Sequence, residues 1–170
     1  MAKNSAEVSE THTTGQNTKL TTVMIIDDDA ISMGFYEVIL EEAGYRVWSA
    51  QDGLFALALL KRESVSPDLI LVDCVMPEMD GKTFLLKLKS QSPQVFVDSK
   101  VVGLTSFDSE STPFKQIKAL AFDCREKPFG AQELLKIVSD YVGTEGPSNR
   151  VSNRRRVLPF RSPHQESNSL

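Results

Sequence analysis

Acidic residues directly follow two apolar segments of this chain, in positions that point to metal-dependent chemistry. Asp27 and Asp28 come after "TTVMII", and Asp73 comes after "LILV". Adjacent carboxylates repel each other, and moving them toward a sheet edge costs desolvation energy, so a cation is needed to offset the cost. Three carboxylates offer an all-oxygen site, which suits Mg²⁺ better than Zn²⁺. The pattern therefore predicts a magnesium site at Asp27, Asp28 and Asp73.

Two further residues at segment ends would complete a site for phosphoryl chemistry. Thr105 ends "KVVGLT", and Lys127 follows "FDCRE". A lysine that faces the acidic cluster balances its charge and contacts an anion brought in by the metal, and a threonine hydroxyl can donate to that anion. Together the residues favour phosphoryl transfer to a carboxylate nucleophile.

Each acidic residue also has a simpler structural interpretation. An aspartate after a strand often caps the next helix, which is the expected role of Asp29. Asp73 and Asp80 could be turn formers around Pro77 and Gly81. Threonine and lysine near strand ends are also common without any chemical role. The joint order of these residues along the chain, more than any one of them, favours the chemical interpretation.

Apolar segments of strand and helix character alternate through the middle of the chain and would position these residues. Such alternation predicts an α/β fold, a doubly wound five-stranded parallel sheet with helices on both faces. In this class the site lies at the carboxyl ends of the strands, where the acidic residues fall. The strands are expected at 20–26, 45–50, 68–73, 100–106 and 122–126, and the helices at 30–44, 53–63, 81–90, 111–121 and 130–142.

Length and composition exclude several classes of protein. A chain of 170 residues fits one domain with tails, and no apolar stretch is long enough for a membrane span. The amino-terminal residues lack the apolar centre of a secretory signal, so a cytoplasmic protein is expected. Two cysteines are too few for a disulfide framework and are expected to be reduced thiols. Glycine-rich phosphate loops are missing, which weakens a nucleotide-binding interpretation.

The termini differ from the middle in composition and charge. Residues 1–19 are polar without apolar periodicity and are expected to be a disordered tail, and residues 143–170 a disordered basic tail. The second tail has five Arg against two Glu, a charge of 5 − 2 = +3, and residues 1–20 sum to zero. With a total of −4, residues 21–142 hold −4 − 3 = −7. A core with this negative charge repels the phosphate backbone of nucleic acids, and no direct DNA binding is expected.

Residues 20–142 resemble the receiver domain of bacterial two-component response regulators. The matching pieces are "VMIIDDDA", "LILVDCVMPEMDG", "VVGLTS" and "REKPF", in this order. The intervals also suit the family: 73 − 27 = 46, 105 − 73 = 32 and 127 − 105 = 22 residues. The resemblance implies a flavodoxin-like sheet with strand order 2-1-3-4-5, and a stand-alone receiver similar to the chemotaxis regulators.

The resemblance also implies roles for the site residues. Asp73 matches the phosphoacceptor, which takes its phosphoryl group from a sensor histidine kinase or a histidine phosphotransfer protein. Asp27 and Asp28 match the pair that holds Mg²⁺, and the backbone carbonyl of Val75 matches a further ligand. Thr105 matches the switch hydroxyl that closes onto the phosphoryl group.

Lys127 matches the lysine that the family carries before a proline, and its bond to Pro128 resembles the cis peptide of the family. A downstream effector protein is expected to bind the face formed by the fourth helix, the fifth strand and the fifth helix. That face includes Lys115, Lys118, Arg125 and Phe129.

Two departures from the family pattern bear on how a signal leaves the domain. Cys124 stands where the family usually has Tyr or Phe, and Ser106 stands where Ala or Gly is usual. A thiol cannot fill the volume of an aromatic ring, and Phe122 is one candidate to replace it in space. Cys124 therefore keeps open the alternative of a receiver-like scaffold that does not depend on phosphorylation.

An enzyme remains as a rival of another class, in the form of a small phosphatase with an aspartyl nucleophile. That class usually has a second acid two residues after the nucleophile, where this chain has Val75. The main prediction is therefore a phosphorylation-dependent signalling switch of a phosphorelay that is not an enzyme, beyond its own Mg²⁺-dependent phosphorylation and dephosphorylation.

Overall fold

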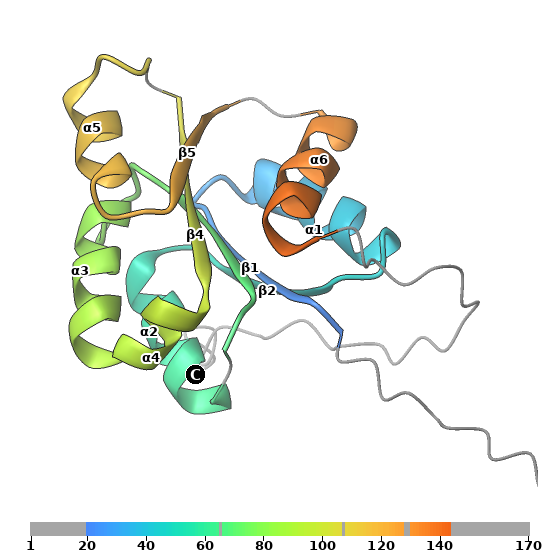
Figure 1. Ribbon diagram of the computed structural model, residues 1–170, viewed down its shortest axis with the longest axis horizontal. Coiled ribbons are helices and arrows are strands. Elements are labelled where there is room, and N and C mark those ends of the chain that lie inside the picture. The colour runs from blue at the N-terminus through green and yellow to red at the C-terminus, as the bar shows by residue number, and fades with distance from the viewer. Residues whose placement is uncertain (1–19, 65, 107, 128–129, 144–170) are drawn as a thin grey trace, which may run out of the picture.

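The structure, a computed structural model, describes residues 20–64, 66–106, 108–127 and 130–143. The predicted tails, apart from Gly143, lie outside these residues, as do Pro128 and Phe129. Five parallel strands form one sheet in the order β2-β1-β3-β4-β5, which confirms the predicted topology (Figure 1). The strands are β1 (Thr22–Ile26), β2 (Arg46–Ala50), β3 (Leu69–Asp73), β4 (Lys100–Thr105) and β5 (Asp123–Glu126).

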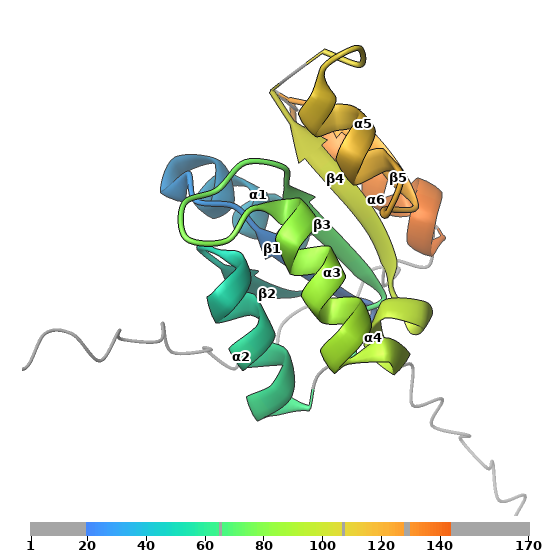
Figure 2. The same cartoon turned by 90° about the vertical axis from the view of Figure 1, so that its left-hand side faces the viewer.

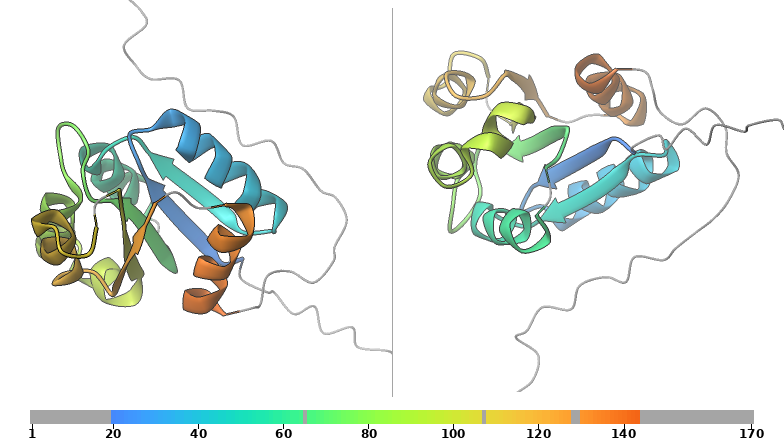
Figure 3. Two further views of the ribbon diagram at one scale, coloured as in Figure 1. Left: turned by 90° about the horizontal axis from the view of Figure 1, so that it is seen from above. Right: turned by 60° about the horizontal axis from the view of Figure 1, so that its bottom comes forward.

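Helices cover both faces of the sheet. On one face α1 and α6 pack against a core that includes Val23, Leu71 and Leu104; on the other, α2, α3 and α5 pack against Met24, Ile70 and neighbouring residues (Figure 3, left). Figure 2 looks onto α2 and α3. The helices are α1 (Ala30–Glu42), α2 (Gly53–Glu63), α3 (Gly81–Gln91), α4 (Pro93–Asp98), α5 (Thr112–Lys118) and α6 (Ala131–Val142).

The central strands are apolar on both sides because both of their faces are covered. Every residue of β1 is buried, and in β3 only Asp73 at its carboxyl end is partly exposed. The edge strand β5 is instead short and polar, and its charged residues disfavour pairing with another chain. The apolar strands thus end in polar residues where the sheet meets solvent.

Side-chain caps begin several helices at the carboxyl edge of the sheet. Asp29, Asp52, Asp80 and Ser111 each accept a hydrogen bond from a backbone N–H in the first turn of α1, α2, α3 and α5 respectively. These bonds satisfy donors that a helix start leaves unpaired. Gly44 has a φ of 89°, a left-handed conformation that glycine adopts without strain, which accords with the predicted stop of the first helix.

Helix α4 was not predicted. It has only six residues, none of them buried, so it lacks the apolar periodicity that marks a longer helix. Pro93 at its first position fits a helix start, since a proline there removes no hydrogen bond. The effector face predicted on the fourth helix therefore corresponds to α5, β5 and α6. Within the described part of the chain, no helix is both long and apolar enough to span a membrane.

Candidate functional site

The structure brings four predicted site residues from different strands to one edge of the sheet. Asp27 follows β1, Asp73 ends β3, Thr105 ends β4 and Lys127 follows β5. Because all five strands are parallel, their carboxyl ends meet at this edge. Asp27 and Thr105 are fully buried.

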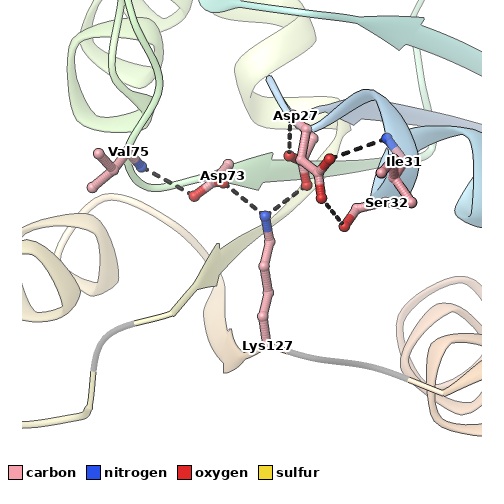
Figure 4. A network of polar contacts seen from close by, with 7 residues as sticks. Asp27, Ile31, Ser32, Asp73, Val75 and Lys127 are labelled. Atoms are coloured by element: carbon pink, nitrogen blue, oxygen red, sulfur yellow. Dashed lines mark hydrogen bonds and ion pairs between the residues drawn. The ribbon is translucent and has the colours of Figure 1, made fainter.

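Lys127 joins two carboxylates at the centre of the site (Figure 4). Its Nζ lies 2.6 Å from Asp27 Oδ2 and 2.7 Å from Asp73 Oδ2, and all three side chains are at most 14% exposed. The backbone N–H of Lys127 donates to the carbonyl of Thr105 at 2.7 Å, which continues the pairing of β5 with β4. The pairing of β5 with β4 therefore orients Lys127 toward the acidic residues.

Burial and charge act in opposite directions on the ionisation of this pair. Burial raises the pKa of Asp27, and the hydrogen bond from Lys127 offsets only part of that rise. Burial lowers the pKa of Lys127, but hydrogen bonds to Asp27 and Asp73 more than offset it, so its pKa lies above the ordinary value. The lysine is accordingly held as an ammonium ion, which balances part of the negative charge.

The acidic cluster has the donor set of a hard-metal site. Oxygen atoms of Asp27, Asp28 and Asp73 lie within 4.8 Å of one another, and burial decreases from Asp27 through Asp73 to Asp28. An exposed ligand beside buried ones gives a cation access from solvent, and the all-oxygen donors fit Mg²⁺. Asp27 Oδ1 accepts the N–H of Asp29 at 3.0 Å, which fixes its carboxylate.

Some of the aspartates at this edge cap helices, and others belong to the acidic cluster. Asp29 caps α1, as expected: its Oδ1 accepts the N–H of Ile31 and its Oδ2 accepts the hydroxyl of Ser32 at 2.6 Å. Asp80 caps α3 by accepting the N–H of Thr83 at 2.7 Å. Asp29 and Asp80 therefore serve as helix caps, and Asp27 and Asp28 remain available for the site.

The loop after β3 is packed tightly around Asp73. The N–H of Val75 donates to Asp73 Oδ1 at 3.1 Å, which orients the carboxylate. A Cβ at Gly81 would lie 2.3 Å from the carbonyl oxygen of Asp73, so only glycine fits there. Met76 and Met79 are buried and anchor the loop on the core. These contacts hold Asp73 in one place.

Thr105 lies beside Cys74, because β3 and β4 pair Asp73 with Leu104 and the next residues follow in register. The N–H of Cys74 donates to the carbonyl of Leu104 at 2.8 Å, which extends that pairing. Burial raises the pKa of the Cys74 thiol to about 12, and a hydrogen bond from Thr105 opposes the rise. Both cysteines are free and buried, which confirms the prediction of reduced thiols.

Ile117, and not Phe122, occupies the space beside Cys124. A Cβ at Gly103 would lie 2.5 Å from Ile117 Cγ2 and 3.0 Å from Cys124 Sγ, so the isoleucine sits directly over the glycine. Phe122 is 63% exposed and packs edge-on against Tyr141, so in this structure its ring lies outside the core cluster that contains Cys124. Ile117 of helix α5 and Cys124 of β5 therefore both border Gly103.

A cavity of about 410 Å³ lies beside Asp73 and Lys127. Of its other lining residues, the sequence interpretation missed Ser32 and Tyr36, and their signal was a helical spacing of three and seven residues from the cap residue Asp29. The lining is made by Asp29, Ser32, Tyr36, Asp73, Ser106 and Lys127.

A doubly wound parallel sheet that gathers acidic residues, a threonine and a lysine at its carboxyl edge defines a class of α/β signalling domain. The chain belongs to the response regulator receiver domain family, whose model matches residues 23–139. Domains of this family act in phosphorelay signalling, which confirms the predicted family and function.

Individual proteins support the same assignment. The chain is 34% identical over 122 residues to the two-component response regulator ARR22 of Arabidopsis thaliana, covering 71% of this chain and 83% of that protein. It is 32% identical over 118 residues to the chemotaxis protein CheY of Bacillus subtilis, covering 69% and 93%. The structure of chemotaxis protein CheY4 of Vibrio cholerae superposes with a TM-score of 0.64 at 29% identity, covering 72% and 99%. The chain spans less than half of several longer curated relatives.

Proposed function

We propose that Asp73 is the phosphoacceptor of a Mg²⁺-dependent switch, and that its phosphoryl group comes from the phosphohistidine of a sensor kinase or phosphotransfer protein. The observation that supports this most is the position of the Lys127 ammonium, between Asp73 and the buried Asp27. One Asp73 oxygen bonds to phosphorus while the bond from phosphorus to the imidazole nitrogen breaks. The residues around Asp73 serve mainly to position and neutralise it.

Asp27, Asp28 and Asp73 would hold Mg²⁺, with the backbone carbonyl of Val75 as a further ligand. The bound ion would neutralise charge on the transferred phosphoryl oxygens. Lys127 screens the Asp73 carboxylate as the anionic donor approaches, and the N–H of Val75 keeps that carboxylate oriented. Thr105 is the switch hydroxyl, which would exchange its place beside Cys74 for a hydrogen bond to the phosphoryl group.

The phosphodonor would dock on α1, whose first turn borders the site. Ile31, Phe35 and Val38 are 83%, 42% and 54% exposed, and their spacing of four and three residues places them on one side of the helix. Apolar side chains gathered on an exposed helix face are typical of a protein-binding surface.

The effector would bind the face of α5, β5 and α6. Lys115, Lys118 and Arg125 supply positive side chains on this face, and acidic groups of a partner would pair with them. Phe129, also predicted for this face, lies outside the described residues. Ile117 connects α5 to Gly103 in the sheet, so a shift of the β4 end would reach this face.

The proposal is tested by incubating the full chain with acetyl phosphate and Mg²⁺ and measuring its intact mass. A gain of one phosphoryl group is expected, and EDTA or Asp73→Asn should abolish it. A phosphorylation-independent scaffold would show no gain, or would show no change in the amide spectra of α5 and β5 after beryllofluoride is added. Catalytic turnover of a generic phosphate ester would favour the phosphatase instead.

A further inference from the structure

The cap residue of α1 and two residues of the helix form one polar line that faces the site. Asp29, Ser32 and Tyr36 follow one another at spacings of three and four, which places them on the same side of the helix. All three line the cavity beside Asp73 and Lys127. The roles proposed above for the site do not use Ser32 or Tyr36.

Tyr36 is an unusual wall for such a cavity because most of its ring belongs to the core. The residue is 3% exposed and packs with Val23, Ile25 and Leu40 in the core between the sheet, α1 and α6. Its hydroxyl nevertheless senses Lys127, Asp27 and Asp73: burial raises its pKa, and the charges of these three residues shift it further in opposing directions. Tyr36 therefore belongs to the core and also borders the cavity of the site.

Hydrogen bonds join the side chains of this line. Ser32 donates its hydroxyl proton to Asp29 Oδ2 at 2.6 Å. A second hydrogen bond joins the side chains of Ser32 and Tyr36 and lowers the pKa of the phenol against the larger rise from burial. A phenol hydroxyl can both donate and accept, so it can also hydrogen-bond to a water in the cavity.

We infer that Tyr36 positions the water that hydrolyses the phosphoryl group on Asp73, and so sets how long the phosphorylated state lasts. The inference rests on the proposed function. In this step the water oxygen bonds to phosphorus, the bond from phosphorus to the Asp73 oxygen breaks, and a water proton leaves to phosphate or solvent. Asp73 returns as a carboxylate and inorganic phosphate is released. Tyr36 is a positioning residue whose hydroxyl hydrogen-bonds to the water, and Ser32 and Asp29 hold that hydroxyl in place.

The test compares two rates in the full chain, phosphorylation by acetyl phosphate with Mg²⁺ and loss of the phosphoryl group after the donor is removed. Tyr36→Phe keeps the ring and removes the hydroxyl. The ratio of the loss rate to the phosphorylation rate should fall about 3- to 10-fold, the effect of one hydrogen bond. Ser32→Ala should lower the ratio in the same direction, and the double variant should match Tyr36→Phe because the two hydroxyls act as one unit.

Tyr45→Phe is the matched control. Tyr45 is buried in the same core, but burial alone raises its pKa, without charges from the site. Its removal should leave the ratio unchanged, while any general loosening of the core would appear in both variants.

An unchanged ratio in Tyr36→Phe, or an equal slowing of both rates, would overturn the inference and leave the proposed function intact. If the wild type takes up no phosphoryl group, both fall. Should Tyr36→Phe fail to fold, Ser32→Ala decides the question by the same ratio.

Discussion

The Nζ of Lys127 lies 2.7 Å from Asp73 Oδ2, although 54 positions separate the two residues in the chain. The same ammonium lies 2.6 Å from Asp27 Oδ2. With Asp28 the cluster has three carboxylates and one ammonium, a formal charge of 1 − 3 = −2. A divalent cation would neutralise this charge, so lysine and metal together make it possible to gather the acidic residues at one sheet edge.

Replacing Lys127 by methionine should destabilise the metal-free protein by about 3 kcal/mol, since a buried carboxylate would lose its partner. Asp27 is fully buried, so it cannot recover the lost contact from water. Addition of Mg²⁺ should restore part of the stability, because the ion would supply the missing positive charge. Urea unfolding in EDTA and in Mg²⁺ measures both effects.

Lys115→Met is the control for that variant. Lys115 pairs with Glu110 at 2.9 Å, but both side chains are more than half exposed. Its loss should cost less than about 0.5 kcal/mol and should not depend on Mg²⁺. Equal losses in the two lysine variants would contradict the central role of Lys127.

Asp28→Asn should have opposite effects on stability and on metal binding. Without Mg²⁺, removal of one negative charge from the cluster relieves repulsion, so the midpoint of thermal unfolding should rise. With Mg²⁺, loss of a charged ligand should weaken binding about 10-fold in calorimetry. Glu41→Gln on α1 removes a charge away from the cluster and should leave Mg²⁺ affinity unchanged; a similar weakening there would point to a general charge effect.

Gly103→Ala should destabilise the protein by about 1–3 kcal/mol, because the new methyl group overlaps Ile117 and Cys124. The strain should also move α5, which amide spectra would show as shifts centred on that helix. Gly34→Ala should change the stability in the opposite direction. Nothing lies within 4 Å of the added Cβ, and alanine in α1 should stabilise the protein by about 0.5–1 kcal/mol. If Gly103→Ala has the stability of the wild type, Ile117 does not connect α5 to the sheet.

The two thiols should be unreactive in the folded protein. Burial raises the pKa of Cys74 to about 12 and that of Cys124 to about 11, against an ordinary value of 9.0. At about pH 8 the folded chain should react with iodoacetamide at least about 100-fold more slowly than the chain in urea. Rapid labelling of the folded chain would contradict the burial of these thiols.

The same shifts predict how stability changes at high pH. The folded state keeps the thiols protonated after the unfolded thiols ionise, so their contribution is complete below pH 9.0 and is lost as pH rises toward about 11–12. Cys124→Ala removes one of these groups and should lose less stability over that interval. A steeper loss of stability in Cys124→Ala would contradict the predicted direction of this pH dependence.

Alternating apolar segments were sufficient to predict five parallel strands, because the buried central strands leave a strong apolar signal, whereas the order of the strands came from the resemblance to the receiver family. The order of Asp27, Asp73, Thr105 and Lys127 predicted the site, since parallel topology brings strand ends together. Helix α4 was missed because six exposed residues leave no periodic pattern.

Contacts between distant elements could not be predicted in the same way. Tyr36 was not singled out in the sequence, and only the fold shows that it lines the cavity. Ile117 is likewise one apolar residue in a short helix, and its position over Gly103 depends on how α5 docks. Such relations arise from packing, which local pattern does not encode.

The position of the acyl phosphate tests the central claim most directly. After treatment with acetyl phosphate and Mg²⁺, borohydride reduces an aspartyl phosphate to homoserine, which tandem mass spectrometry of peptides locates. Homoserine is expected at position 73 alone and should disappear when Mg²⁺ is removed. Homoserine at position 27 or 28, or at no position, would contradict the assignment of Asp73 as the residue that Lys127 and the acidic cluster prepare for phosphorylation.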